Sequence, residues 1–207
     1  PLPLQNAEED LLSIASYAQG VDYHIFLRPL LAQIVQFIHN QYDQPFQSFI
    51  FTDSGPLLER EIAYQAQLGW IGKNSCLINQ KFGSSFFLSE ILLNFPLTVP
   101  SKFPQCLPER CGTCCRCIEQ CPTHCIQTDR TIDARKCISY LTIENKGEIP
   151  LEFRKAIGNH LFGCDICQQC CPWNQKASVR WDISERSYFV QDFFKEGNCK
   201  EVFSEAD

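Results

Sequence analysis

Hydrophobic residues recur every three or four positions between residues 22 and 42, and this spacing predicts an amphipathic helix. The stretch contains Pro29, which lacks a backbone N–H and is best tolerated in a first helical turn. We therefore expect the regular part of the helix to begin near Leu27. Residues before this point would form the approach to the helix.

Two further patterns complete the first part of the chain. Residues 46–52 are aromatic and β-branched and predict a buried strand, which is followed by a helix over residues 57–68. Residues 75–79 and 85–93 predict two strands joined as a hairpin with a glycine at the turn. These elements indicate a mixed α/β domain.

The later part of the chain has fewer regular patterns. A proline-bearing linker is predicted over residues 96–108. Residues 150–160 predict a helix that is ended by Gly163. Residues 181–207 are polar and aromatic without further signal, and we expect a C-terminal extension there.

The 14 cysteines carry the clearest chemical signal. Cys111, Cys114, Cys117 and Cys121, followed by Pro122, have the spacing of bacterial ferredoxin loops, in which three thiolates bind one cluster and the fourth binds a second. The second Cys-Pro pair is Cys171-Pro172, and Cys167 and Cys164 precede it at the required spacings. The position expected for the next ligand is Leu161, which cannot bind iron. The nearest upstream candidate is Cys137. Cluster one is therefore assigned Cys111, Cys114, Cys117 and Cys171, and cluster two is assigned Cys121, Cys137, Cys164 and Cys167.

Zinc sites and disulfides are the alternatives to iron–sulfur clusters. Cys-x2-Cys pairs also occur in zinc knuckles, but zinc does not require a three-residue step that ends in Cys-Pro. Disulfides are expected in exported proteins, and the sequence shows no apolar secretory segment. The remaining cysteines are expected to be small buried thiols: Cys76, Cys106, Cys115, Cys125, Cys170 and Cys199.

Length and charge limit the other possibilities. A chain of 207 residues can bury one sizeable core and a small module, and its formal charge of −6 gives no support to nucleic-acid binding. No run is long enough to span a membrane, and we expect a cytoplasmic protein. The chain starts at Pro1 and contains no Met, which indicates either a piece of a longer chain or methionines missing from the sequence.

Three features could serve either structure or chemistry. Asp53 follows the predicted strand, where a carboxylate can face a ligand crevice, although an N-cap is the simpler role. His24 is a ligand or proton carrier in one interpretation and a surface or capping histidine in the other. Residues 69–74 place two glycines around Trp70 and Ile71, a tight path that a flat ligand could approach closely.

Together these stretches resemble the cobalamin-dependent epoxyqueuosine reductases of tRNA modification. The matching segments are five: residues 17–24, 53–60, 69–74, 137–144, and the stretch from 162–167 through 171–174. The resemblance covers roughly residues 10–176, and it is specific because it joins five separate stretches to the ferredoxin loops.

The resemblance implies an α/β (α+β) corrinoid-binding domain like that of reductive dehalogenases, followed by a two-cluster ferredoxin-like module. Residues 1–100 would form part of the first domain, 101–180 the second and 181–207 the extension. The implied cofactors are cobalamin and two 4Fe–4S clusters, and Asp53 is the implied proton donor. The residues implied to face cobalamin are Ser16, Tyr17, Asp22, Tyr23, His24, Gly69, Trp70, Ile71, Gly72, Lys73, Asn74, Ser139 and Tyr140.

The implied reaction is reduction of epoxyqueuosine to queuosine at the wobble position of tRNA. The expected partners are a tRNA anticodon stem-loop that carries epoxyqueuosine and an external electron donor, with no membrane and a monomeric enzyme. Two other classes stay open: a corrinoid reductive dehalogenase and a non-catalytic electron-transfer subunit. About a hundred residues of α/β core before the clusters argue against the latter.

Overall fold

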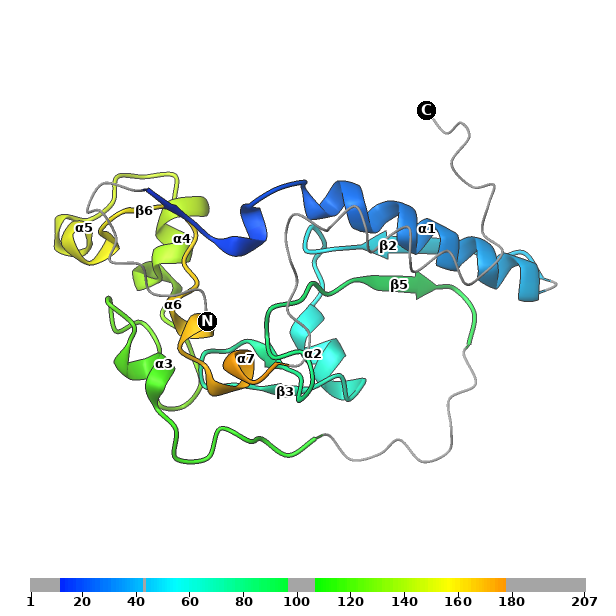
Figure 1. Cartoon of the computed structure of the whole chain (residues 1–207). Coiled ribbons are helices and arrows are strands. Elements are labelled where there is room, and N and C mark those ends of the chain that lie inside the picture. The colour runs from blue at the N-terminus through cyan, green and yellow to red at the C-terminus, as the bar shows by residue number, and fades with distance from the viewer. Residues whose placement is uncertain (1–11, 43, 97–106, 178–207) are drawn as a thin grey trace. The chain divides into compact units, whose positions relative to one another are not determined.

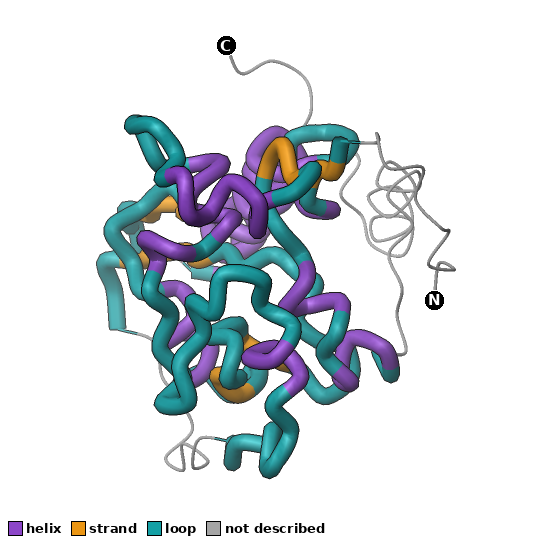
Figure 2. Tube along the Cα trace, turned by 90° about the vertical axis from the view of Figure 1, so that its left-hand side faces the viewer, coloured by secondary structure: helices purple, strands orange, loops and turns teal. Residues whose placement is uncertain are grey.

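The computed structural model describes residues 12–42, 44–96 and 107–177 (Figure 1). These residues form two compact units, and each unit combines segments that are separate in the sequence. Unit 1 contains residues 12–19, 60–86 and 107–177, and unit 2 contains residues 20–42, 44–59 and 87–96. Short helices and strands joined by long loops make up most of the described chain (Figure 2).

The predicted long helix of unit 2 is confirmed as α1 (Tyr23–Gln41). It begins four residues before the expected start near Leu27, because the Asp22 side chain caps it by accepting a hydrogen bond from the His24 N–H at 2.9 Å. Pro29 consequently lies inside the helix and not in its first turn. Because Pro29 has no N–H, the carbonyl of Ile25 lacks its helical hydrogen bond. Ile25 is 68% exposed, so water can solvate this carbonyl.

Unit 2 also contains an antiparallel pair of strands, β2 (Ser48–Phe51) and β5 (Glu90–Leu93). Phe51 lies opposite Glu90 in this pair. The strand at β2 is confirmed, but the expectation that it is buried is wrong, since Phe49 is 61% exposed. The expected hairpin is also wrong, because β5 pairs with β2 and not with the strand at residues 75–79.

Unit 1 contains two other strand pairs. β3 (Trp70–Ile71) pairs antiparallel with β4 (Leu77–Ile78), and β1 (Ser13–Ile14) pairs in parallel with β6 (His160–Phe162). The glycines at residues 69 and 72 allow β3 to approach β4 closely. A side-chain carbon at Gly69 would collide with the Ile78 carbonyl, and one at Gly72 would collide with the Ile78 side chain.

The helices of unit 1 are short. They are α2, α3 (Arg116–Glu119), α4 (Ile138–Ile143), α5 (Leu151–Ile157), α6 (Ile166–Gln169) and α7 (Pro172–Gln175), with the 3-10 turns η1 (Ser16–Ala18) and η2 (Ala134–Lys136). α2 covers Glu59–Gln65, which is shorter than the predicted 57–68 at both ends, and its first residue belongs to unit 2.

The prediction that Gly163 ends the helix near residue 150 is wrong. α5 ends at Gly158, which has a φ of +58° that glycine adopts without steric cost. The chain then enters β6 before it reaches Gly163. β6 thus occupies three of the six residues between the end of α5 and Cys164.

The core of unit 1 is built around cysteines. Three buried clusters contain or contact them: Trp70, Ile78 and Cys171; Cys121, Cys125 and Ile126; and Ile138, Leu141 and Ile157, against which Cys164 packs. The rings of Trp70 and Trp173 meet edge to face at 4.9 Å in the first cluster. The apolar packing of this unit therefore surrounds the predicted cluster ligands.

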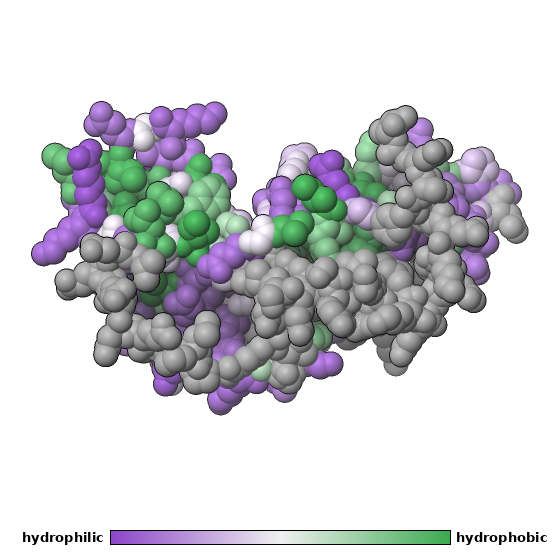
Figure 3. Space-filling model, turned by 45° about the horizontal axis from the view of Figure 1, so that its top comes forward, coloured by the Kyte–Doolittle hydropathy of each residue, from purple (hydrophilic) through white to green (hydrophobic). Residues whose placement is uncertain are grey.

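Apolar side chains also lie on the described surface of both units (Figure 3). Leu151 of unit 1 is 78% exposed, and Phe37 of unit 2 is 64% exposed. Within the described ranges, no helix combines the length and the apolar character that crossing a membrane requires. The predicted linker at 96–108 and the extension at 181–207 lie largely or wholly outside the described residues.

Candidate iron–sulfur sites and the aspartate turn

The four cysteines predicted for cluster one line a single cavity of about 240 Å³ in unit 1. Cys111 and Cys114 are joined by a turn in which the Cys114 N–H donates to the Cys111 carbonyl at 3.0 Å. Cys117 lies in α3, and Cys171 occupies the position before the first residue of α7. Residues 60 positions apart in the sequence thus present their thiols to the same space.

The four cysteines predicted for cluster two line a second, smaller cavity of about 40 Å³. Cys121 follows α3, and Cys137 lies between η2 and α4. Cys164 lies in the loop before α6, and Cys167 lies within α6. Cys125 lines the same cavity. Its sulfur lies 3.4 Å from that of Cys121.

The donor set of both cavities fits a 4Fe–4S cluster, which is held by four thiolates. Within the described ranges, no group of three or more His, Cys, Asp or Glu side chains could hold a metal ion. Burial raises the pKa of Cys117 to about 12 and that of Cys164 to about 11, so iron would have to supply the positive charge that favours the thiolate.

Cys125 was predicted to be a small buried thiol, and it is buried. The sequence did not predict its contacts with two of the assigned ligands. Hydrogen bonds from Cys125 lower the pKa of Cys121 to about 4 and that of Cys137 to about 6. Cys76 likewise contacts a ligand, and a hydrogen bond from Cys167 is the main cause that lowers the pKa of Cys76. Cysteine spacing alone gives no signal for such contacts.

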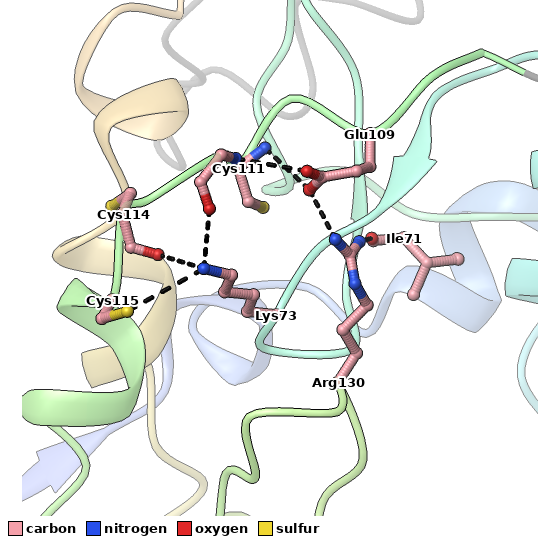
Figure 4. Close-up of polar contacts among 8 residues, drawn as sticks. Ile71, Lys73, Glu109, Cys111, Cys114, Cys115 and Arg130 are labelled. Atoms are coloured by element: carbon pink, nitrogen blue, oxygen red, sulfur yellow. Dashed lines mark hydrogen bonds and ion pairs between the residues drawn. The ribbon is translucent and has the colours of Figure 1, made fainter.

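Lys73 holds the first cysteine loop (Figure 4). Its Nζ donates to the Gly112 carbonyl at 2.8 Å and the Cys114 carbonyl at 3.0 Å, and it lies 3.8 Å from the sulfur of Cys115. Lys73 and Asn74 also line the first cavity. The structure therefore places this end of residues 69–74 against the cysteine site.

Glu109 holds the same loop from the other side (Figure 4). Its carboxylate accepts from the Cys111 N–H at 3.1 Å and pairs with the Arg130 guanidinium at 2.6 Å. The hydrogen bond from Arg130 is the main cause that lowers the pKa of Glu109. Arg130 also donates to the Ile71 carbonyl at 2.9 Å. The sequence analysis did not predict the Glu109–Arg130 pair, because no sequence motif relates these two residues.

The other residues predicted to face cobalamin in unit 1 are distributed over several elements. The Ser16 N–H donates to Asp165 Oδ2 at 2.6 Å, and the Ser16 hydroxyl bonds to the same oxygen. Trp70 is only 1% exposed and packs in the core. The remaining members are Tyr17 in η1, Gly69 and Gly72 against β4, Ile71 in β3, and Ser139 and Tyr140 in α4.

Asp53 and the residues 22–24 come together in unit 2. The Tyr23 hydroxyl donates to Asp53 Oδ2 at 2.7 Å. His24 Nδ1 lies 2.9 Å from Asp22 Oδ1, and His24 Nε2 lies 3.1 Å from the Ser54 hydroxyl. The capping role for Asp53 is excluded, because α2 begins six residues later at Glu59. Asp53 is exposed, so its carboxyl is accessible to a substrate.

The cysteine sites and the short-helix fold around them define a protein with two iron–sulfur clusters. A family model described as a 4Fe–4S double cluster binding domain matches residues 110–174. A second model, described as epoxyqueuosine reductase QueG, matches residues 2–54. The predicted resemblance is confirmed: the chain is homologous to the epoxyqueuosine reductases.

The relatives give the extent of this homology. The epoxyqueuosine reductase of Xanthomonas campestris is 49% identical over 164 residues, which are 79% of this chain and 45% of the relative. That of Cyclobacterium marinum is 44% identical over 175 residues, which are 84% of this chain and 55% of the relative. The chain therefore spans about half the length of the curated relatives it matches.

Solved structures agree with these relatives. An epoxyqueuosine reductase with an epoxyqueuosine-modified tRNA-Tyr stem loop has a TM-score of 0.73 at 32% identity and matches 82% of this chain and 43% of its own. An epoxyqueuosine reductase from Bacillus subtilis, whose catalytic aspartate loop is swung out of the active site, has a TM-score of 0.72 at 31% identity, with the same coverage.

Proposed function

We propose that the protein is an epoxyqueuosine reductase that reduces epoxyqueuosine to queuosine at the wobble position of tRNA. The observation that carries this proposal is the convergence of the eight predicted cysteines on two cavities of unit 1. Homology to epoxyqueuosine reductases supplies the reaction, and the tRNA complex of one relative supports a tRNA stem loop as the partner.

The proposed ligands of cluster one are Cys111, Cys114, Cys117 and Cys171, and those of cluster two are Cys121, Cys137, Cys164 and Cys167. Lys73 and Glu109 would hold the first loop in its binding conformation through the bonds described above. Cys115 and Cys170 do not line either cavity, which supports leaving them out of the ligand sets.

The reaction converts an epoxide into an alkene. Two carbon–oxygen bonds break, a carbon–carbon double bond forms, and two electrons and two protons are taken up as the oxygen leaves as water. When bound, the clusters supply single-electron transfer and cobalamin supplies low-potential cobalt chemistry that side chains lack. The electrons would come from an external donor.

Asp53 is the group on this chain that would supply a proton to the departing oxygen. Its carboxyl is exposed, and the bond from the Tyr23 hydroxyl to Oδ2 orients it in the turn. In the Bacillus subtilis relative the catalytic aspartate loop can leave the active site. We infer that the turn at Asp53 is the corresponding loop.

Several finer features belong to the same proposal. Residues 1–100 would form part of a reductive-dehalogenase-like α/β domain that binds the corrinoid, and the residues that bind it would be those implied by the family resemblance. Residues 101–180 would form the ferredoxin-like domain, and residues 181–207 the extension. The enzyme would act as a cytoplasmic monomer. The polar network of Asp22, Tyr23, His24 and Asp53 supports this proposal because it gathers four of the implied residues in unit 2.

The test is turnover of an epoxyqueuosine-modified stem loop by anaerobically reconstituted protein with cobalamin and a low-potential donor. Asp53→Asn should retain iron and cobalamin but lose about a hundredfold in turnover, the usual scale for a missing general acid. Asp129→Asn is the matched control, because within the described ranges the Asp129 side chain bonds to Thr131 alone, in a local turn. Near-normal turnover by Asp53→Asn would refute the acid role.

A further inference from the structure

The backbone at Asp53 adopts a conformation that is unusual for a residue with a side chain. Its φ is +58°, and the Ser54 N–H donates across it to the Thr52 carbonyl at 2.6 Å. A three-residue turn with a positive central φ is rare and strained. Such a conformation persists only when neighbouring groups hold it, and it often occurs at functional sites.

Two contacts hold this turn within unit 2. Thr52 is 5% exposed, and its hydroxyl lies 2.8 Å from the Ser89 hydroxyl, which fixes the turn to the residue before β5. On the other side, the Asp53 N–H donates to Glu59 Oε1 at 2.6 Å. Glu59 is therefore the side chain that accepts the backbone N–H of the strained residue.

The Glu59 carboxyl has a second carboxyl, that of Glu90, as its neighbour. Glu90 lies in β5 opposite Phe51, close to the end of the strand that leads into the turn. Its Oε2 is buried and receives no hydrogen bond from the described part of the chain. Burial and the adjacent Glu59 carboxyl raise the pKa of Glu90 to about 7. A proton held between the two carboxyls satisfies the buried oxygen and removes the repulsion between like charges.

We propose that Glu59 and Glu90 form a positioning pair, in which Glu90 fixes Glu59 through a shared proton and Glu59 holds the Asp53 turn with its carboxyl aimed at the substrate. This inference rests on the proposed function, since it assigns Asp53 the role of acid. Neither glutamate touches the reacting atoms in this proposal. Both act through the backbone of Asp53.

The pair makes the turn sensitive to pH. The other titratable groups around it are Asp53, Tyr23, which donates to Asp53, and the Asp22–His24 pair, whose imidazole reaches Ser54. As the pH rises from 4.5 through about 7, the unfolded chain releases the Glu90 proton before the folded chain does. The free energy of unfolding therefore falls as the pH rises over this range. Above about pH 7, repulsion between the Glu59 and Glu90 carboxylates opposes the conformation of the Asp53 turn.

The conservative variants separate the parts of this arrangement. Glu59→Ala removes the acceptor of the Asp53 N–H. Glu59→Gln keeps an oxygen for that N–H and offers an amide N–H to Glu90 without a shared proton. Glu90→Gln mimics protonated Glu90 at every pH. Glu61→Ala is the matched control, because Glu61 lies in the same helix and bonds only to Gln65 among the described residues.

The experiment combines amide hydrogen exchange of residues 48–58 with steady-state kinetics on the modified stem loop. In Glu59→Ala, protection of the turn should fall and kcat should drop at least tenfold, with KM, iron content and cobalamin content unchanged. Glu59→Gln should restore both protection and kcat, and Glu61→Ala should behave as the wild type. Protection in the wild type should fall as the pH passes about 7, and Glu90→Gln should abolish this dependence.

Three results would overturn the inference. Unchanged protection in Glu59→Ala would do so whatever the activity, and so would equal losses of kcat in Glu59→Ala and Glu59→Gln. A KM effect without a kcat effect would also contradict a positioning role. If the wild type fails to turn over the stem loop while Glu59→Ala loses protection, the proposed function fails and the structural part of the inference stands.

Discussion

Asn174 is the side chain whose removal should most directly loosen the first cysteine cavity. It lies in α7, three residues after Cys171, and its Oδ1 accepts from the Ser84 N–H at 2.5 Å. Its Nδ2 donates to the Ser84 hydroxyl at 2.9 Å and to the Gln168 carbonyl at 2.7 Å. One amide thus joins the turn after β4 to α6 and α7.

The magnitude of Asn174→Ala follows from these three bonds. A typical intramolecular hydrogen bond contributes about 1 kcal/mol, and a buried group left without a partner costs about 1–3 kcal/mol. Ser84 is 9% exposed, so water would replace the lost acceptor poorly. We expect a loss of about 3 kcal/mol in the free energy of unfolding, which lowers Tm by about 6–12 °C in a chain of this size.

The assay is thermal unfolding followed by circular dichroism, on samples matched for iron content, with loss of cluster absorbance recorded in parallel. Asn145→Ala is the matched control, because Asn145 makes one exposed, local bond to the Gly147 carbonyl at 2.8 Å and should cost less than about 1 kcal/mol. Equal Tm shifts in the two variants would refute the reasoning, since they would show that the three bonds of Asn174 add nothing.

Two further predictions concern the cluster sites. Cys137→Ala should lower iron from about eight to about four atoms per chain, whereas Cys115→Ala should keep about eight; normal iron in Cys137→Ala would remove Cys137 from cluster two. Lys73→Met should shift the reduction potential of cluster one to lower values, because it removes a positive charge that favours the reduced state. Lys155→Met on α5 is the control in the same redox titration, and an equal shift there would show that the position of Lys73 is unimportant.

The cysteine sites could be predicted from the sequence because ferredoxin ligands follow a fixed spacing. The same spacing left one ligand open, and Cys137 was inferred because it is the nearest upstream cysteine and completes a set of eight. The structure brings Cys137 to the cavity that Cys164 and Cys167 line. The helix at 23–41 was also predictable, since its apolar residues have the helical period along the whole element.

Strand pairing could not be predicted in the same way. The stretch at 85–93 was expected to pair with its neighbour in sequence, but Gly83, with φ +72°, and the bonds of Asn174 to Ser84 direct the turn toward α7. β5 pairs instead with β2, about 40 residues earlier. A local pattern identifies a strand, whereas its partner depends on contacts between distant segments.

The sequence by itself determined the cysteine ligand pattern and the long helix, because both depend on residue type and on short-range spacing, whereas Asp53 became the candidate acid through the family resemblance. Only the tertiary structure decided what surrounds them: the Cys125 contacts, the Lys73 and Glu109 bonds to the first loop, and the Glu59–Glu90 pair behind Asp53. The Lys73 bonds form only when folding brings this side chain to a loop about 40 residues later in the chain. The other contacts are shorter in sequence, but they depend on local turns that no motif specifies.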